Sequence, residues 1–265
     1  MQATSIIRKL VALTCLCLAS ALNGQTNLHG FGSSREMQAL AAVVTLSGSP
    51  QMEGKRVSLR EVFDPNAVKF HQGYQDDIGI VLGNQISVHA MEGARWEIEQ
   101  LSGNLRFRDT LPWERETTRS QTIIRVRQGS FAFRADHLND ESTFTIKTHL
   151  GDLRVQRATG VVKVFSGFVM VGIESGQVYF ENEYTQNPLM ISEGRCIELS
   201  DTSAIRLNSL SRKTWEQDPI HVRQIEIARA NAKRVYFTQN SNNATLLGTD
   251  LTDVVWITPE RKQNQ

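Results

Sequence analysis

One stretch, Phe144 to Leu199, restricts the fold more than any other part of the chain. Its apolar residues recur at every second position, which places one side of each run in a core and the other in water. This alternation is typical of antiparallel β-strands. Because glycine readily adopts the positive φ of tight turns, we expect short strands joined at glycine turns. The expected turns lie at Gly151, Gly160, Gly167, Gly176 and Gly194.

The same alternation begins near Asp76, so the predicted β-domain extends well to the N-terminal side of this stretch. Further turns are expected at Gly83, Gly93 and Gly129. Polar segments at 109–121 and 136–141 are typical of surface loops. The apolar segment 37–46 could be a short helix or a strand, and its β-branched Val-Val-Thr triplet favours a strand. We therefore place a β-domain at 37–208.

Beyond residue 208 the period of the apolar pattern changes to that of a helix. Asp218 and Pro219 form a helix start, with aspartate as the cap and proline in the first turn. An amphipathic stripe follows, through residue 237. The segment 251–258 is expected to form a terminal strand, so 209–265 is predicted as a C-terminal helix and strand. The predicted fold class is mainly β: an antiparallel β-roll or sandwich of short strands with glycine turns, plus one C-terminal α-helix.

Residues 1–21 have the features of a secretory signal peptide. Arg8 and Lys9 precede a nine-residue apolar run, and a small-x-small cleavage site ends the segment. The run is far shorter than the ~20 residues that span a bilayer, so no transmembrane span is expected after cleavage. A retained anchor or a lipidated Cys15 are the alternatives. Residues 22–36 are predicted as a flexible lead-in, and the protein is expected to be exported to the periplasm or cell envelope.

The charge balance argues against a nucleic-acid partner. The whole chain has 29 basic and 28 acidic side chains, a formal net charge of +1. Loss of Arg8 and Lys9 with the signal peptide would leave a slight acidic excess. Nucleic-acid-binding domains usually carry a basic excess, so we predict no nucleic-acid partner.

Metal and cofactor sites are not predicted. The six histidines lack the local spacing of zinc ligands, and no phosphate-binding or dinucleotide-binding glycine motif occurs. His89 alternates with apolar residues in a predicted strand and is expected to face solvent. Cys196 would be the one cysteine left after signal cleavage, and we expect it to be buried as a small apolar residue.

Two pairs of carboxylates allow an enzymatic alternative. Asp76 and Asp77 precede a predicted strand, whereas Glu114 and Glu116 lie in the loop 109–121. Glycosidases use a pair of carboxylates, but turns and surface loops commonly contain such pairs without any catalytic role. We predict no catalytic residues, and the protein is expected not to be an enzyme.

A partner-binding surface is the alternative to a catalytic site. The candidate residues combine aromatic rings, which could stack on a sugar or a protein, with a cation. Aromatic residues in strands are more often core or cross-strand pairs. The predicted partner surface consists of Trp113, Arg115, Tyr179 and Tyr184.

The order of strands and turns resembles the FecR-like domain family of bacterial envelope proteins. Phe144–Thr148 is similar to the family's F-x-V-x-T segment, although His149 and Ala158 stand where the family usually has proline and glycine. The segments that carry the resemblance lie within residues 76–199, roughly half of the chain. They are 78–88, 96–98, 124–133, 144–148, 155–159, 171–178 and 191–194.

The resemblance implies an exported, β-rich domain with a sensing, binding or structural role. We therefore expect a non-enzymatic protein of the cell envelope that binds a protein or glycan partner in signalling or envelope assembly. Open strand edges would provide the surface for such a partner. The alternatives are a carbohydrate-active enzyme that uses loop carboxylates and a structural subunit of an envelope complex that docks through its helix.

Overall fold

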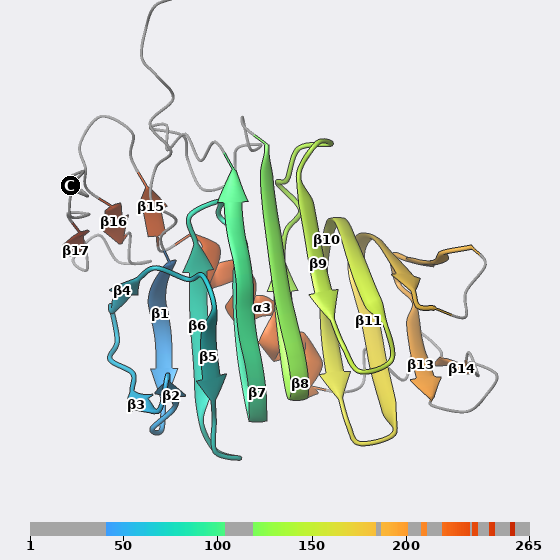
Figure 1. Cartoon of the computed structure of the whole chain (residues 1–265), viewed down its shortest axis with the longest axis horizontal. Coiled ribbons are helices and arrows are strands. Elements are labelled where there is room, and N and C mark those ends of the chain that lie inside the picture. Colours follow the sequence, from blue (N-terminus) through green and yellow to red (C-terminus); the bar gives the residue numbers. More distant parts are fainter. Residues whose placement is uncertain are drawn as a thin grey trace, which may run out of the picture. The chain divides into compact units, whose positions relative to one another are not determined.

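The computed structural model describes residues 41–103, 119–183, 187–200, 208–210, 219–233, 235–237, 244–246 and 255–257. All of them belong to one compact unit, Met37–Gln265. Over these residues the chain is mainly β, with a single α-helix, α3 (Pro219–Ala232), towards the C-terminus (Figure 1). The predicted fold class is confirmed. The predicted boundaries at residues 21, 36 and 208 stay predictions.

The strands form one large and one small sheet. The large sheet contains β1 (Ala41–Ser47), β2 (Gln51–Met52), β3 (Lys55–Arg56), β4 (Val62–Phe63), β5 (Val68–His71), β6 (Asp77–Leu82), β7 (Ser87–Gly103), β8 (Ser120–Arg134), β9 (Thr143–Lys147), β10 (Asp152–Val164), β11 (Phe168–Glu181), β12 (Leu189–Ser192), β13 (Cys196–Ser200) and β14 (Asn208–Leu210). The small sheet contains β15 (Val235–Phe237), β16 (Ala244–Leu246) and β17 (Val255–Ile257).

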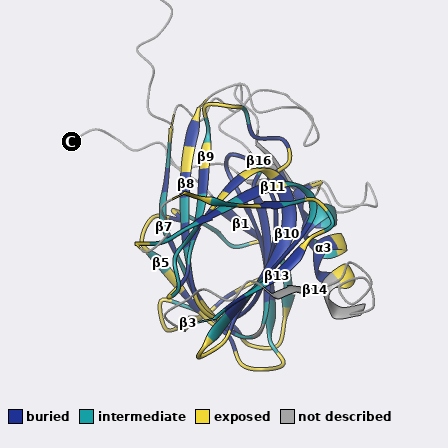
Figure 2. Cartoon of the chain, turned by 90° about the vertical axis from the view of Figure 1, so that its right-hand side faces the viewer, coloured by how far each residue is buried: buried dark blue, intermediate teal, exposed yellow. Residues whose placement is uncertain are grey.

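Four long strands, β7, β8, β10 and β11, fold the large sheet into two facing layers (Figure 2). Each of them pairs with different neighbours along its two halves. For example, β7 pairs with β6 over 87–90 and with β5 over 95–98. Likewise, β11 pairs with β13 over 168–172 and with β12 over 177–180.

The two layers can be named by what covers their outer faces. The helix-covered layer contains β1, β6, β13 and the halves of the long strands that pair with them. The open layer contains β5, β9, β12 and the other halves. The helix α3 contacts β6, β7, β8 and β10, and Figure 2 shows it outside the layer that contains β10 and β13.

The long strands bend where the backbone adopts positive φ. The bends lie at Gly93 (φ 71°) in β7, Gly129 (φ 92°) in β8, Arg157 (φ 47°) in β10 and Gly176 (φ 81°) in β11. The ladders shift register at the same places, as in a β-bulge. Each bend therefore carries a continuous strand from one layer to the other.

These bends correct the prediction of short strands with a turn at each glycine. The four long strands run for 13 to 17 residues. Gly93, Gly129, Gly160 and Gly176 all lie inside them, whereas Gly151, Gly167 and Gly194 lie between strands as predicted. The physical reason is that pairing resumes on both sides of each bend, so a residue that could end a strand redirects it instead.

The main core lies between the layers and contains the alternating residues of the opening stretch. Phe144, Ile146, Val171 and Ile173 are buried, in agreement with the period-two pattern. The strand predicted within 37–46 is β1, and the terminal strand predicted within 251–258 is β17. The strand predicted at 205–207 lies outside the described residues, and β14 follows it.

The helix begins where the sequence predicted but ends earlier. Pro219 is the first residue of α3, and the stripe residues Ile225, Ala228 and Ala232 are buried. The prediction extended the helix to residue 237, which is wrong, because 235–237 form β15. This segment, Val-Tyr-Phe, is β-branched and aromatic, and it pairs with β16.

Candidate functional site

A row of side chains crosses the outer face of the open layer and ends at a sheet edge. Cross-strand pairing places Thr145 of β9 beside Arg154 of β10, Arg154 beside Tyr179 of β11, and Tyr179 beside Met190 of β12. We call these four residues the edge row. Among the described strands, β12 pairs only with β11. The edge row therefore leads from the middle of the layer to an open strand.

The outer end of the edge row combines an aromatic ring, a cation and an exposed apolar side chain. Met190 is 53% exposed, although its side chain is large and apolar. Tyr179 is half-buried, and its hydroxyl donates a hydrogen bond of 2.9 Å to Gln177 Oε1. The Arg154 guanidinium forms an ion pair with Glu181. Aromatic, methionine and arginine side chains are enriched in protein interfaces.

Of the predicted partner surface, the structure places Tyr179 alone. Trp113, Arg115 and Tyr184 lie outside the described residues, so whether the four residues come together stays a prediction. Arg154 and Met190 were not predicted. The register of the strands joins them to Tyr179, and no sequence motif marks them.

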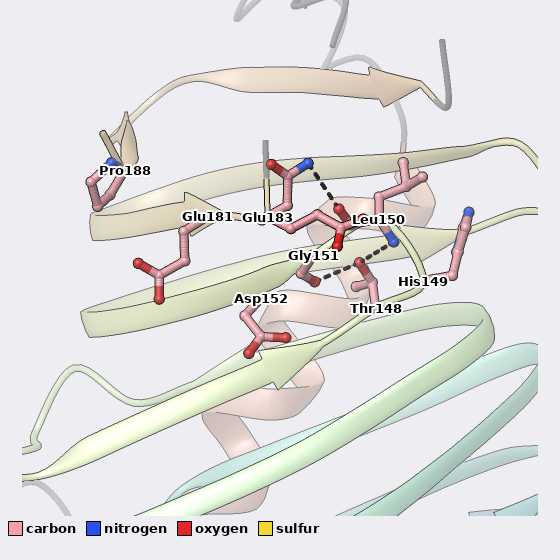
Figure 3. Close-up of a pocket in the computed structure, with 9 residues that line it drawn as sticks. Thr148, His149, Leu150, Gly151, Asp152, Glu181, Glu183 and Pro188 are labelled. Atoms are coloured by element: carbon pink, nitrogen blue, oxygen red, sulfur yellow. Dashed lines mark hydrogen bonds between the residues drawn. The ribbon is translucent and has the colours of Figure 1, made fainter. Parts of the chain in front are cut away.

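An open pocket of about 590 Å³ lies next to the start of the edge strand β12 (Figure 3). The turn between β9 and β10 forms one side. Thr148 closes this turn, because its hydroxyl donates to the carbonyl of Gly151 at 2.8 Å, and Asn182 Nδ2 donates to the carbonyl of Leu150 at 3.3 Å. The lining residues are Thr148, His149, Leu150, Gly151, Asp152, Glu181, Asn182, Glu183 and Pro188.

The pocket contains a pair of carboxylates that sequence reasoning missed. Asp152 and Glu181 are cross-strand partners, on β10 and β11. Directly opposed residues have their Cβ atoms about 5 Å apart, and opposed like charges are unfavourable; the Glu181–Arg154 ion pair offsets that repulsion. The sequence did contain a signal for this pair. In a hairpin, residues at equal distances before and after the turn face each other, so the turn at 165–167 pairs Val164 with Val169. Twelve residues further out on each strand, the same count pairs Asp152 with Glu181.

The carboxylates named from the sequence have other surroundings. Asp76 caps a turn: its two oxygens accept hydrogen bonds of 2.8 Å from the backbone N–H groups of Ser49 and Gly73. Asp77 is partly buried, and burial raises its pKa, an effect that the charge of Arg223 partly offsets. Glu114 and Glu116 lie outside the described residues.

The position of His89 corrects an expectation. It was predicted to face solvent, but it is only 1% exposed. Alternation correctly places it on the face opposite the main core; the helix-covered layer, however, has α3 on that face. Burial, together with the charge of Arg223, lowers the pKa of His89 to about 4, so this imidazole is neutral at pH 7.

Cys196 is buried, as predicted. Burial, reinforced by the nearby charge of Glu198, raises the pKa of its thiol to about 11, which makes it a poor nucleophile. Within the described ranges, no three His, Cys, Asp or Glu side chains are placed to share a metal ion. Within the same ranges, no helix has the length and apolar character needed to span a bilayer.

Comparison with known proteins gives a distant structural likeness. No family profile matches the sequence, and no curated protein matches it. Two crystal structures of a "putative anti-sigma factor" from Parabacteroides distasonis ATCC 8503, at 2.50 and 1.65 Å resolution, are similar in fold. Their sequence identities are 13% and 15%, and their TM-scores are 0.43 and 0.41. The alignments cover 57% of this chain and 64% and 65% of those chains, so this chain spans just under two thirds of their length.

Proposed function

We propose that this chain is an exported, non-enzymatic protein of the bacterial cell envelope that binds a partner in signalling or envelope assembly. The sequence left a protein and a glycan open as partners, and the edge row favours a protein. A peptide strand that added to β12 would gain main-chain hydrogen bonds from the open edge and side-chain contacts from Tyr179 and Met190. The single observation that carries the proposal is this open edge beside an exposed apolar residue.

The alternatives have weaker support. An enzyme could use the carboxylates of the pocket, but Glu181 already forms an ion pair with Arg154. Among the carboxylates named from the sequence, Asp76 already caps a turn. A structural subunit that docks through its helix would have to use the exposed face of α3, since the opposite face packs on the protein's own sheet.

Partner binding at β12 is tested by placing a photo-crosslinking amino acid at position 190 of the full-length protein expressed in its own cells. The crosslinker at 190 is expected to capture a distinct envelope protein. The matched control is position 145, which belongs to the same row but lies three strands inward from β12. Equal capture at both positions would contradict a binding site at the edge.

Two substitutions of Met190 are expected to distinguish binding at the edge strand from nonspecific association. Met190→Lys puts a charge on the edge strand, which opposes strand addition, and should lower recovery of the partner at least tenfold. Met190→Leu keeps the apolar character and should stay within twofold of the wild type. Quantitative co-purification measures both. Neither change should alter the thermal midpoint of unfolding greatly, because Met190 is half exposed. Equal recovery of the partner with both variants would exclude the β12 edge as the binding site.

Export is a separate prediction with its own measurement. If the signal peptide is cleaved after residue 21, the intact mass of the protein purified from its own cells should correspond to a chain that begins at residue 22. The same preparation should come from the envelope fraction. A chain that still begins at Met1, or that carries a lipid on Cys15, would contradict cleavage at this site.

A further inference from the structure

The helix α3 lies over a cross-strand row of mostly small residues. Figure 1 shows it crossing behind the strands β6, β7 and β8. The pairing register joins the residues of this row one after another across seven strands, from β1 to β13. The small-residue row consists of Thr45, Gly79, His89, Ala132, Val161, Gly172 and Cys196. His89 is its largest member, and small residues flank it on both sides.

Few apolar contacts hold α3 on this row. Ile225 and Ala228 pack against Ala132, Val161 and Cys196 in a cluster separate from the main core. Polar contacts to the sheet come from the middle of the helix and from its C-terminal end. Ser130 Oγ donates to Gln224 Oε1 at 2.8 Å, Thr45 Oγ1 donates to Asn231 Oδ1 at 2.6 Å, and Arg229 pairs with Glu174 at 2.7 Å.

Hydrogen bonding under α3 is incomplete in the part of the chain that the structure describes. The amide nitrogens of Gln224 and Asn231, the hydroxyl of Ser87 and both ring nitrogens of His89 are buried without a hydrogen-bond partner. A buried polar group without a partner favours the state in which water reaches it. The unpartnered polar groups therefore weaken the contact between α3 and the sheet.

We propose that α3 is a releasable cover over this face of the sheet and that protonation of His89 opens it. The release would uncover the small-residue row while the two-layer core stays folded. Val235, which follows the helix, belongs to the main core, so the C-terminal end of α3 is tethered and its N-terminal end is the part that moves first. This inference concerns the layer opposite the edge row and does not depend on the partner proposed for β12.

The charged groups around His89 determine the direction of the effect. From β6, Asp77 Oδ2 lies 4.0 Å from His89 Nε2, which is too long for a hydrogen bond but would favour a proton on the ring. From α3, the charge of Arg223 opposes that proton, and β8 places the uncharged Ala132 opposite. Burial acts in the same direction as Arg223, and together they outweigh Asp77.

The pH range follows from the two protonation states. When α3 is released, His89 would regain an ordinary pKa of 6.5, against about 4 in the covered state. The released state then binds more protons, so the covered state is fully stable above pH 6.5 and loses stability as the pH falls towards 4. Asp77 has the opposite effect on this pH dependence. Burial raises its pKa in the covered state, so its protonation at low pH favours the covered state.

Hydrogen exchange of backbone amides tests the proposal on the full chain at pH 7.5 and pH 5.0, corrected for the intrinsic pH dependence of exchange. Amides of α3 should open about 30-fold more often at pH 5.0, while those of β8 and β10 keep their protection. The His89→Gln variant should reduce this change to less than threefold. His71→Gln, which alters an exposed histidine of β5, should behave like the wild type.

A second variant checks that α3 opens independently of the sheet. A Cβ atom at Gly79 would lie 2.2 Å from Asn231 Nδ2, so Gly79→Ala should raise α3 exchange by a similar factor at both pH values. The proposal is overturned if α3 amides exchange only together with β8, or if the pH dependence persists in His89→Gln. Should His89→Gln fail to fold, NMR titration of the wild type decides, because a His89 that titrates near pH 6.5 in the folded protein is incompatible with the proposal.

Discussion

Substitution of Gly176 by alanine is expected to lower the free energy of unfolding by at least about 3 kcal/mol. Gly176 bends β11 with a φ of 81°, and a left-handed conformation costs an L-residue about 1–2 kcal/mol. The added Cβ would also lie 2.0 Å from the carbonyl oxygen of Arg157 and 2.7 Å from the Cα of Ala158. Both neighbours are backbone atoms at the bend of β10, so neither can move without opening the β10–β11 ladder.

Gly93→Ala is the matched control for this prediction. Gly93 bends β7 with a similar φ of 71°, but nothing lies within 4 Å of the position that a Cβ would occupy. Only the backbone cost remains, about 1–2 kcal/mol. Urea unfolding followed by circular dichroism measures both variants. Equal losses of unfolding free energy in the two variants would show that the close backbone approach at Gly176 does not contribute to the cost. The strands β10 and β11 would then be less closely packed at this bend than the structure shows.

Substitution of Trp96 by alanine is expected to cost about 3–5 kcal/mol of stability. The Trp96 side chain is fully buried between the layers. Its ring stacks on Phe70 of β5 with centroids 4.2 Å apart, and it meets the edge of Phe131 from the helix-covered layer at 5.3 Å. Alanine would leave a cavity that the bent strands around it cannot close, since each of them is fixed by pairing on both sides.

Trp96→Phe separates the packing of this ring from its polar atom. Phenylalanine keeps a ring against Phe70 and removes the indole N–H, which is buried without a hydrogen-bond partner among the described residues. The loss should therefore be less than half of that for alanine. Chemical unfolding followed by far-ultraviolet circular dichroism avoids dependence on tryptophan fluorescence. If the two variants lose equal stability, the aromatic contacts of residue 96 with Phe70 and Phe131 do not hold the layers together.

The burial of individual strand residues was predictable because it depends on local alternation. Phe144, Ile146, Val169 and Val171 alternate with polar or less buried residues over a few positions, and each of these four is in the core. Likewise, the helix start at Pro219 needs only the two residues Asp218 and Pro219 to be recognised. Patterns of this kind are short, and the backbone geometry of a strand or a helix turn converts them directly into a buried side.

The candidate sites were less predictable because they join residues that are distant in the sequence. Tyr179 was named from its residue type, but its neighbours Arg154 and Met190 follow from the pairing of β10, β11 and β12. Trp113, Arg115 and Tyr184 stay predictions. The Asp152–Glu181 pair in the pocket needed the register of a long hairpin, which a count from its turn would have supplied.

By itself, then, the sequence determined that the chain is mainly β, which residues of the alternating strands face the main core, and where the helix begins, since all three depend on residues a few positions apart. The tertiary structure alone decided which glycines bend a strand instead of ending it, and what faces His89. A glycine permits either a turn or a bend, and the strands that pair on both sides of Gly129 and Gly176 select the bend. The outward side of β7 meets solvent or a helix according to where α3 packs, and α3 lies more than a hundred residues further along the chain.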